Sequence, residues 1–349
     1  MITDGKYQDS FIYRDSCPDV PFVDKSHGSF TGYVGLFLYM KDPAQTFQPA
    51  TSFYGGNTMT FYNELDKIMK QDMGNRGFLP TLPANPIAQA FETLKSASRV
   101  ILLTGFPVRM ADGSFIGETD GPSGTANLAA ALTEFGAEVL VLTDKASYHL
   151  LEAALEYRAP KAKLALIPET ETDNFEINCI HEFNPTHFIS LERPGKASDG
   201  HFHNMRGESI DDMITDSTTL LSEAKKFGAM TISIGDGGNE MGMGAYHDEV
   251  VAHVPFGEII CAEDGAEITL TSGVSNWWGW GLSALLSLHA GKNLLPSAEV
   301  ETELLHRVVV AGGVDGCTKE HTETVDNLSR ETHLGVLRAV QEALNKEMN

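Results

Sequence analysis

Residues 231–240 (TISIGDGGNE) join an apolar run to a dense group of polar side chains. The run is rich in β-branched residues and is typical of a short buried strand. The glycines that follow would let the backbone approach a ligand closely. Asp236, Asn239 and Glu240 then supply two carboxylates and an amide at the carboxyl end of the strand, where open α/β sheets bind ligands. A plain strand-to-helix turn with solvated acids would show the same pattern.

A second strand-to-helix turn follows residues 99–104 (RVILLT). Pro122 suits the first turn of a helix, and Gly136 is placed to end that helix. The free N–H groups at the start of the helix could hold a carboxylate or phosphate. Glu118 and Asp120 lie just before that end, although the helix dipole alone would also favour acids there.

Two further regions carry polar side chains beside expected strands. Residues 267–271 alternate like a strand, and Ser275 and Asn276 follow as good helix N-caps. Arg193 and Arg206 lie after another strand-like run, and each could bind a carboxylate or phosphate through two hydrogen bonds.

Seven blocks of this sequence resemble, in the same order, those of the D-glutamate cyclase-like C-terminal domain family. They are residues 104–108 (TGFPV), 117–122 (GETDGP), 190–195 (SLERPG), 204–207 (NMRG), 235–240 (GDGGNE), 275–277 (SNW) and 314–316 (VDG). The resemblance runs from about Asp72 almost to the C-terminus. It implies a hydro-lyase reaction, the cyclisation of D-glutamate to 5-oxo-D-proline with loss of water. Metal-dependent phosphatase activity has been suggested for similar sequences, and a phosphatase remains an alternative.

Lactam closure requires an unprotonated α-amine to attack the γ-carboxyl carbon, and a carboxylate is a poor electrophile. A divalent metal or an arginine could neutralise that carboxylate, and a protonated acid could help an oxygen leave as water. We expect the catalytic acids and bases to be Glu118, Asp120, Asp236 and Glu240. Asp120, Asp236 and Glu240 are also the expected metal ligands, and their oxygen atoms favour Mg²⁺ or Mn²⁺ over zinc.

The other candidate residues would bind a small anionic substrate. Arg193 or Arg206 would hold its α-carboxylate, and Asn239 and Asn276 would orient it. The predicted substrate-binding residues are Thr104, Gly105, Gly121, Ser123, Gly124, Glu192, Arg193, Asn204, Arg206, Gly237, Gly238, Asn239, Ser275, Asn276 and Asp315. The same groups would serve a phosphatase. A non-catalytic module for small anions or nucleotides would gain nothing from so many carboxylates, and no nucleotide cofactor is expected.

The composition restricts partners and location. With 25 basic and 48 acidic residues, the formal charge is −23, which argues against nucleic acid or an anionic membrane as a partner. No stretch approaches the ~20 apolar residues of a membrane span, and the N-terminus lacks a signal pattern. Cys17, Cys179, Cys261 and Cys317 are far apart, which favours reduced thiols and a cytoplasmic protein.

Strand and helix patterns alternate from residue 99 onward. Strands are expected at 99–104, 138–143, 163–167, 186–191, 231–234 and 267–271, with helices from 122, near 146–157, near 217–227 and up to 289. This alternation is typical of an α/β fold with a doubly wound, mostly parallel sheet flanked by helices in three α/β/α layers. Residues 72–349 would form that domain. Residues 1–71 would form an irregular arm with a short helix near 60–69, packed on the body or on a second subunit of a homo-oligomer.

Overall fold

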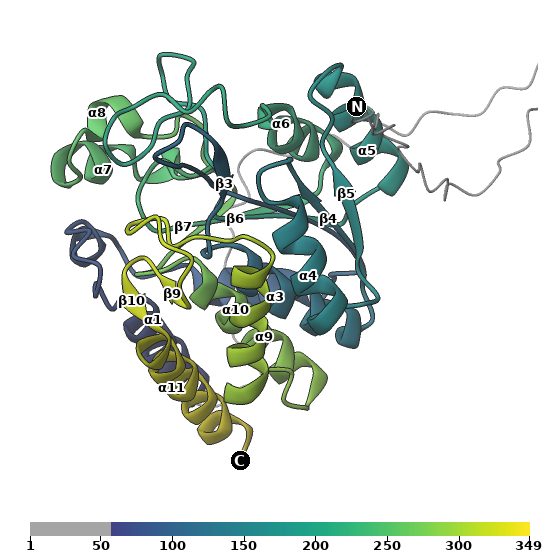
Figure 1. The fold of residues 1–349 in the computed structure, drawn as a ribbon. Coiled ribbons are helices and arrows are strands. Elements are labelled where there is room, and N and C mark those ends of the chain that lie inside the picture. The colour runs from purple at the N-terminus through teal and green to yellow at the C-terminus, as the bar shows by residue number, and fades with distance from the viewer. Residues whose placement is uncertain (1–56) are drawn as a thin grey trace, which may run out of the picture. The chain divides into compact units, whose positions relative to one another are not determined.

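A six-stranded sheet forms the centre of the protein (Figure 1). The computed structural model describes residues 57–349, which belong to one compact unit, Phe53–Asn349. The strands are β1 (Arg99–Thr104), β4 (Glu138–Thr143), β5 (Lys163–Leu166), β6 (His187–Leu191), β7 (Met230–Gly235) and β8 (Ile268–Thr271). Their order is β5-β4-β1-β6-β7-β8, and every neighbouring pair is parallel, so the predicted parallel sheet is confirmed.

Helices connect the strands and cover both faces of the sheet. They are α1 (Asn57–Met69), α2 (Ile87–Leu94), α3 (Pro122–Phe135), α4 (Tyr148–Arg158), α5 (Thr172–Phe183), α6 (Thr218–Phe227), α7 (His247–His253), α8 (Gly257–Ile260), α9 (Asn276–Ala290), α10 (Ala298–Val310) and α11 (Arg330–Met348). Two hairpins lie outside the sheet, β2 (Pro107–Arg109) with β3 (Phe115–Gly117) and β9 (Thr324–Val325) with β10 (Leu328–Ser329).

Alternate residues of the central strand enter two different cores. Val100 and Leu102 of β1 pack in the core with α1–α4 and α9–α11, whereas Ile101 and Leu103 pack in the core under α5 and α6. Figure 1 shows α5 and α6 on one side of the sheet and α3, α9 and α10 on the other. A strand that is buried on both faces is mainly apolar along its length. This explains why β1 could be predicted from the sequence.

The chain reverses its direction across the sheet between β1 and β6. From β1 it proceeds outward to β4 and β5, and it then returns to β6 and continues to β7 and β8. Ligands of open α/β sheets bind at such a switch point. Gly105 and Glu192, the first residues after β1 and β6, are joined there by a 3.0 Å hydrogen bond from Gly105 N to Glu192 O. Their φ angles of +118° and +47° turn the chain sharply away from both strands.

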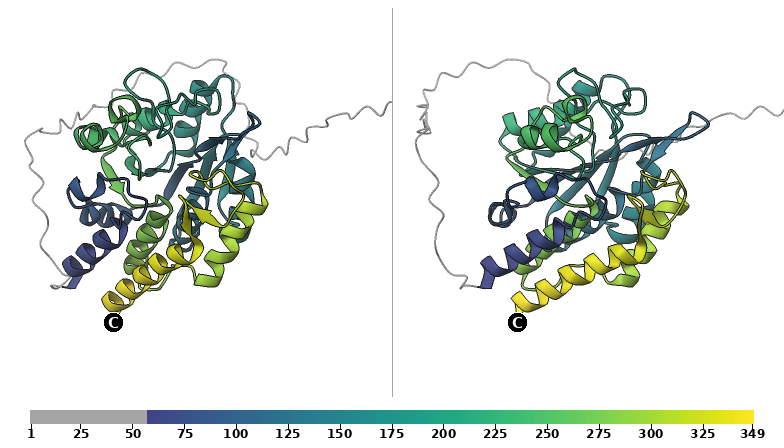
Figure 2. Two further views of the ribbon diagram at one scale, coloured as in Figure 1. Left: turned by 60° about the vertical axis from the view of Figure 1, so that its left-hand side comes forward. Right: turned by 90° about the vertical axis from the view of Figure 1, so that its left-hand side faces the viewer.

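Helix α1 is present where a short helix was expected, and it belongs to the compact unit. Its residues Phe61, Leu65 and Met69 are buried in the main core. Figure 2 shows α1 running beside α11, and Glu64 and Lys346 form a 2.8 Å ion pair between them. The domain boundary predicted at 71/72 therefore lies later than the start of this unit. The remainder of the predicted arm, and its contact with a second subunit, lie outside the described residues.

Residues 57–349 contain no helix that combines the length and apolar character needed to cross a membrane. Cys179, Cys261 and Cys317 are free thiols, and Cys17 lies outside the described residues. The cytoplasmic location stays a prediction.

Glu176 on α5 is a buried acid that makes the stability of this layer depend on pH. Its Oε2 accepts a 3.0 Å hydrogen bond from Leu220 N, while Oε1 has no partner. Burial, and then the nearby Asp216, raise the pKa of Glu176 from 4.5 to about 8. The folded protein therefore holds a proton that the unfolded chain releases. The associated stability is complete below about pH 4.5 and is lost as the pH rises through 8.

We expect Glu176→Gln to abolish most of this loss, because glutamine is neutral at every pH. The variant should be ~2–4 kcal/mol more stable than the wild type at pH 9 and nearly equal to it at pH 5. Urea unfolding at the two pH values measures the difference, with the exposed Glu331→Gln as a control. An equal stability difference at both pH values would contradict the prediction.

Candidate active site

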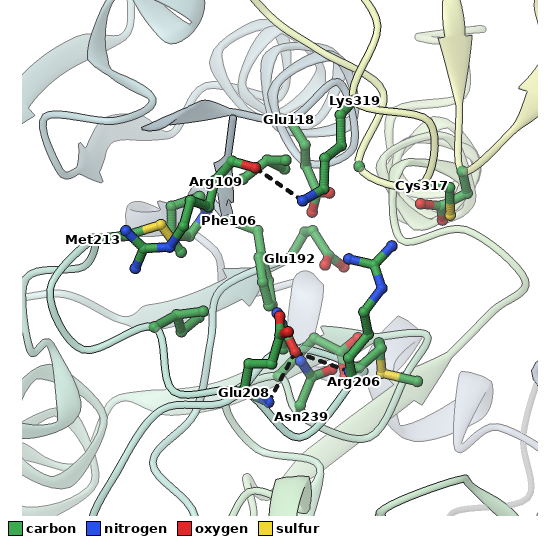
Figure 3. Close-up of a pocket in the computed structure, with 18 of the residues that line it drawn as sticks. Phe106, Arg109, Glu118, Glu192, Arg206, Glu208, Met213, Asn239, Cys317 and Lys319 are labelled. Carbon is green, nitrogen blue, oxygen red and sulfur yellow. Dashed lines mark hydrogen bonds between the residues drawn. The ribbon is translucent and has the colours of Figure 1, made fainter. Parts of the chain in front are cut away.

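A cavity of about 530 Å³ opens at the carboxyl ends of β1, β6 and β7 (Figure 3). Figure 3 shows the carboxyl groups of Glu118 and Glu192 pointing into the same space from different elements. Four of the lining residues are acids that were predicted as site residues from segments far apart in the sequence: Glu118, Glu192, Asp236 and Glu240. Arg76 also lines the cavity. The predicted Asn204, Arg206 and Asn239 also line the cavity.

Arg76 is the buried cation of this pocket. Its Nη2 lies 2.8 Å from Asp236 Oδ1 and 2.8 Å from Asp326 Oδ2, and its side chain is 15% exposed. Asp72 fixes the turn that presents it, because its carboxylate accepts hydrogen bonds from the N–H groups of Arg76 and Gly77 at 2.7 and 2.8 Å. Arg76 therefore offsets the charge of two carboxylates at once.

Glu118 and Glu192 are buried acids with raised pKa values. Burial raises the pKa of Glu118 well above its usual range, and the nearby Asp326 and Asp120 raise it further. Burial has the same effect on the pKa of Glu192, where Glu240 is the next cause. The Oε2 atom of Glu192 has no hydrogen-bond partner. A pocket floor made of such buried acids suits a ligand that brings protons or positive charge.

The glycine loop after β7 holds Glu240 rather than a ligand. Glu240 Oε1 accepts hydrogen bonds from Asp236 N at 3.1 Å and Gly237 N at 2.7 Å, and Oε2 accepts one from Gly238 N at 2.8 Å. The N–H groups of Gly237 and Gly238 therefore already have a partner, and the two glycines do not line the cavity. The Asp236 carboxylate reaches the pocket, where Ser275 N donates to Oδ2 at 3.1 Å.

Asp120 lies under the pocket floor. Its Oδ1 accepts a 2.8 Å hydrogen bond from Asn276 N, and its Oδ2 accepts a 3.0 Å bond from Ser275 N. Burial raises its pKa to about 7, with a contribution from Asp326. Asp120 does not line the cavity, so we expect it to act through its neighbours.

Two groups of three carboxyl groups have oxygens within 4.8 Å of one another. They are Asp120, Asp236 and Asp326 in one group, and Glu192, Asp236 and Glu240 in the other. The predicted triad of Asp120, Asp236 and Glu240 therefore does not form a single group. Because Arg76 already contacts two members of the first group, the second group is the better candidate for a divalent cation.

The start of helix α3 is capped by an asparagine, contrary to the sequence prediction of an anion site. Asn276 Oδ1 accepts hydrogen bonds from Gly121 N at 3.0 Å and Gly124 N at 2.7 Å, and its Nδ2 donates to Thr119 O at 3.0 Å. A Cβ atom on Gly124 would lie 2.7 Å from Asn276 Cα, so only glycine allows this approach. Gly121, Ser123, Gly124 and Asn276 do not line this cavity, and their ligand roles stay a prediction.

Gly121 is therefore a structural glycine, and Gly121→Ala should destabilise the fold. Its φ is +101°, and a Cβ atom there would lie 2.7 Å from Thr104 Oγ1. Gly136→Ala is a matched control, because Gly136 has φ +107° with nothing within 4 Å of its Cβ position. Gly121→Ala should cost ~1–3 kcal/mol more stability than Gly136→Ala in urea unfolding. Equal stability costs together with lost ligand binding would restore the anion-binding role.

Arg193 is buried and fully used by protein partners. It donates hydrogen bonds to Ser217 Oγ at 3.0 Å, Asp144 Oδ2 at 2.7 Å and Thr215 O at 2.5 Å. It does not line the cavity, so of the two predicted arginines the structure brings only Arg206 to the pocket. Arg206, by contrast, is exposed, and Figure 3 shows its side chain at the pocket.

The remaining predicted substrate-binding residues lie behind the residues that line the pocket. Asp315 is buried, and its Oδ1 accepts hydrogen bonds from Cys317 N and Thr318 N, both at 2.9 Å. Thr104 and Ser275 are also buried behind the lining, and Gly105 N is bonded to Glu192 O. These four residues position the pocket rather than contact its contents.

Several lining residues were absent from the predicted site. Asp326 lies between β9 and β10, 250 residues from its partner Arg76. Arg109, Glu208 and Lys319 lie on a hairpin and loops that carry no motif. Residues that reach the pocket from such segments leave no local pattern in the sequence.

The fold and the pocket define a class: a doubly wound α/β/α protein with an acid-lined pocket at the switch point of its sheet. The sequence profile of the family described as D-glutamate cyclase-like, C-terminal matches residues 65–341. The chain belongs to this family, as the seven blocks indicated. It is 29% identical over 286 residues to human "D-glutamate cyclase, mitochondrial". The matched region covers 78% of this chain and 45% of the relative. The chain thus spans about half the length of that relative.

Proposed function

We propose that the protein is an enzyme that closes the lactam ring of D-glutamate, giving 5-oxo-D-proline and water. One observation carries the proposal: Glu118 and Glu192 face one enclosed space beside the buried Arg76, at the switch point of the sheet. The family membership and the name of the human relative support the same activity.

The acids of the floor would handle the protons of this reaction. The carboxylates attract the substrate ammonium group, and a deprotonated one can take a proton from it so that the amine can attack. Glu118, in its protonated form, is placed to give a proton to the oxygen that leaves the γ-carbon as water. Burial and the neighbouring acids raise the pKa of Glu118, which favours this protonated form.

Two side chains of the wall would orient the substrate. Arg206 is exposed at the pocket and can hold the α-carboxylate through two hydrogen bonds. Asn239 is held in place because its Nδ2 donates to His203 O at 2.8 Å. Binding both ends of the substrate would bring the amine close to the γ-carbon.

A divalent cation fits the group formed by Glu192, Asp236 and Glu240. All three offer oxygen ligands, which suits Mg²⁺ or Mn²⁺. Within residues 57–349 the buried Glu192 Oε2 has no hydrogen-bond partner, which leaves it able to bind a ligand. A cation bound there would supply positive charge to polarise the γ-carboxyl group.

Calorimetry with Mn²⁺ tests this cation site. Glu192→Gln should weaken Mn²⁺ binding at least about tenfold, because it removes a charged ligand. Glu118→Gln is the matched control. Glu118 belongs to neither group of three carboxyl residues, so this variant should bind Mn²⁺ like the wild type. Equal Mn²⁺ affinities for the wild type and Glu192→Gln would exclude the site.

A pair of turnover assays tests the proposed function. Purified protein with Mg²⁺ or Mn²⁺ is incubated with D-glutamate and, separately, with a chromogenic phosphate ester. We expect 5-oxoproline from the first assay and no phosphate from the second. Phosphate release without 5-oxoproline would favour a phosphatase, and no turnover of either substrate would favour a binding module.

A further inference from the structure

The pocket floor is built from many more acidic than basic side chains. Arg76 stands among six buried carboxyl groups, those of Glu118, Asp120, Glu192, Asp236, Glu240 and Asp326. The γ-carboxylate of free glutamate would place a further acidic group among them. A neutral γ-amide would bring none, and its carbonyl carbon is a better electrophile than that of a carboxylate.

The cavity is also larger than free glutamate requires. Its volume of about 530 Å³ lies within the range of ~300–1,000 Å³ that holds drug-sized ligands. Part of its wall is apolar and is formed by Phe106, Val108, Ile210 and Met213. Glutamate has no apolar group to place against this wall, so a larger substrate would use the space better.

A cation on the rim has no acidic partner. Lys319 lines the pocket, and its Nζ donates a 2.9 Å hydrogen bond to Arg109 O (Figure 3). An ammonium group has three donors, so two remain for a ligand. Arg109, beside it, is paired with Asp212 at 2.5 Å. Among residues 57–349, Lys319 makes no ion pair. Its ammonium group can therefore pair with a ligand carboxylate in the outer part of the pocket.

We infer that the preferred substrate is a γ-glutamyl amide of an apolar amino acid. The glutamyl part would occupy the floor, the second side chain would pack on Phe106 and Met213, and the second carboxylate would pair with Lys319. This inference rests on the proposed ring-closing function.

The reaction balances without a co-reactant. The α-amine nitrogen attacks the γ-carbonyl carbon, the lactam C–N bond forms, and the bond from the γ-carbon to the amide nitrogen breaks. The two protons lost by the attacking ammonium end on the leaving nitrogen. The products are therefore 5-oxoproline and a free amino acid.

The test compares γ-D-glutamyl-leucine with D-glutamate, each with Mg²⁺ or Mn²⁺, by measuring 5-oxoproline and leucine. We expect kcat/KM to be at least tenfold higher for the dipeptide, with the two products in equal amounts. Lys319→Gln should lower kcat/KM for the dipeptide at least fivefold more than for D-glutamate. Lys161→Gln, an exposed lysine paired with Glu134, should change neither value.

The outcomes separate this inference from the proposed function. Cyclisation of D-glutamate with an equal or slower reaction of the dipeptide would overturn the inference and keep the function. Leucine release without 5-oxoproline would also overturn the inference. Reaction of the dipeptide alone would support the inference and limit the function to amides, whereas no 5-oxoproline from either compound would overturn both.

Discussion

Glu118→Gln is expected to lower kcat for ring closure ~10²–10⁴-fold, the usual contribution of a positioned general acid. The change keeps the shape of the side chain and removes a carboxyl group that burial and two acidic neighbours make costly to ionise. The melting temperature should therefore stay the same or rise. Steady-state assays of 5-oxoproline and thermal unfolding measure the two effects.

Glu331→Gln is the control for this variant, because Glu331 is exposed on α11 and pairs only with the surface residue Arg338. It should match the wild type in both measurements. A wild-type kcat for Glu118→Gln would remove Glu118 from the reaction. A lower kcat that comes with a large fall in melting temperature would show a structural role instead.

Arg76→Met is expected to destabilise the protein by ~3–5 kcal/mol at pH 8, the usual cost of removing one partner from a buried ion pair. Burial already raises the pKa of Asp236 well above its usual range, and Arg76 opposes that rise. Without Arg76 the pKa of Asp236 should be higher still. An acid with a raised folded-state pKa loses stability as the pH rises, so the deficit should shrink as the pH falls from 8 to 5.

Urea unfolding of wild type and variant at pH 5 and pH 8 tests the role of Arg76. Arg338→Met is the control, since it breaks an exposed pair and should cost less than about 1 kcal/mol at either pH. An Arg76→Met deficit that is small, or that is equal at both pH values, would contradict the ion-pair role.

Most of the sheet could be predicted because burial on both faces makes its inner strands, such as β1 and β6, mainly apolar. The bounds of β1 and β4 agree residue for residue with the sequence prediction. Helix α11 was not predicted, although its buried Leu334, Leu337, Val340 and Leu344 recur at the spacing of an amphipathic helix. Its place beside α1 depends on contacts between the two ends of the described chain.

The acids of the site could be found in the sequence, but their partners could not. Glu118 and Asp236 stand out because each follows a strand in a glycine-bounded loop. Arg193 has the same local appearance as Arg206, and only the fold brings Asp144 to it. Asn276 was correctly recognised as a residue of helix-capping type, yet it caps α3 rather than its own helix. Such roles depend on contacts between residues 49 to 155 positions apart.

Nuclear magnetic resonance of D-glutamate labelled with ¹³C at the γ-carboxyl carbon and with ¹⁵N at the amine tests the central claim most directly. Ring closure joins these two atoms, so a one-bond ¹³C–¹⁵N coupling should appear when the wild-type protein is added with Mg²⁺ or Mn²⁺. It should appear far more slowly with Glu118→Gln. If no such coupling forms from labelled D- or L-glutamate with either metal, the protein is not a glutamate cyclase.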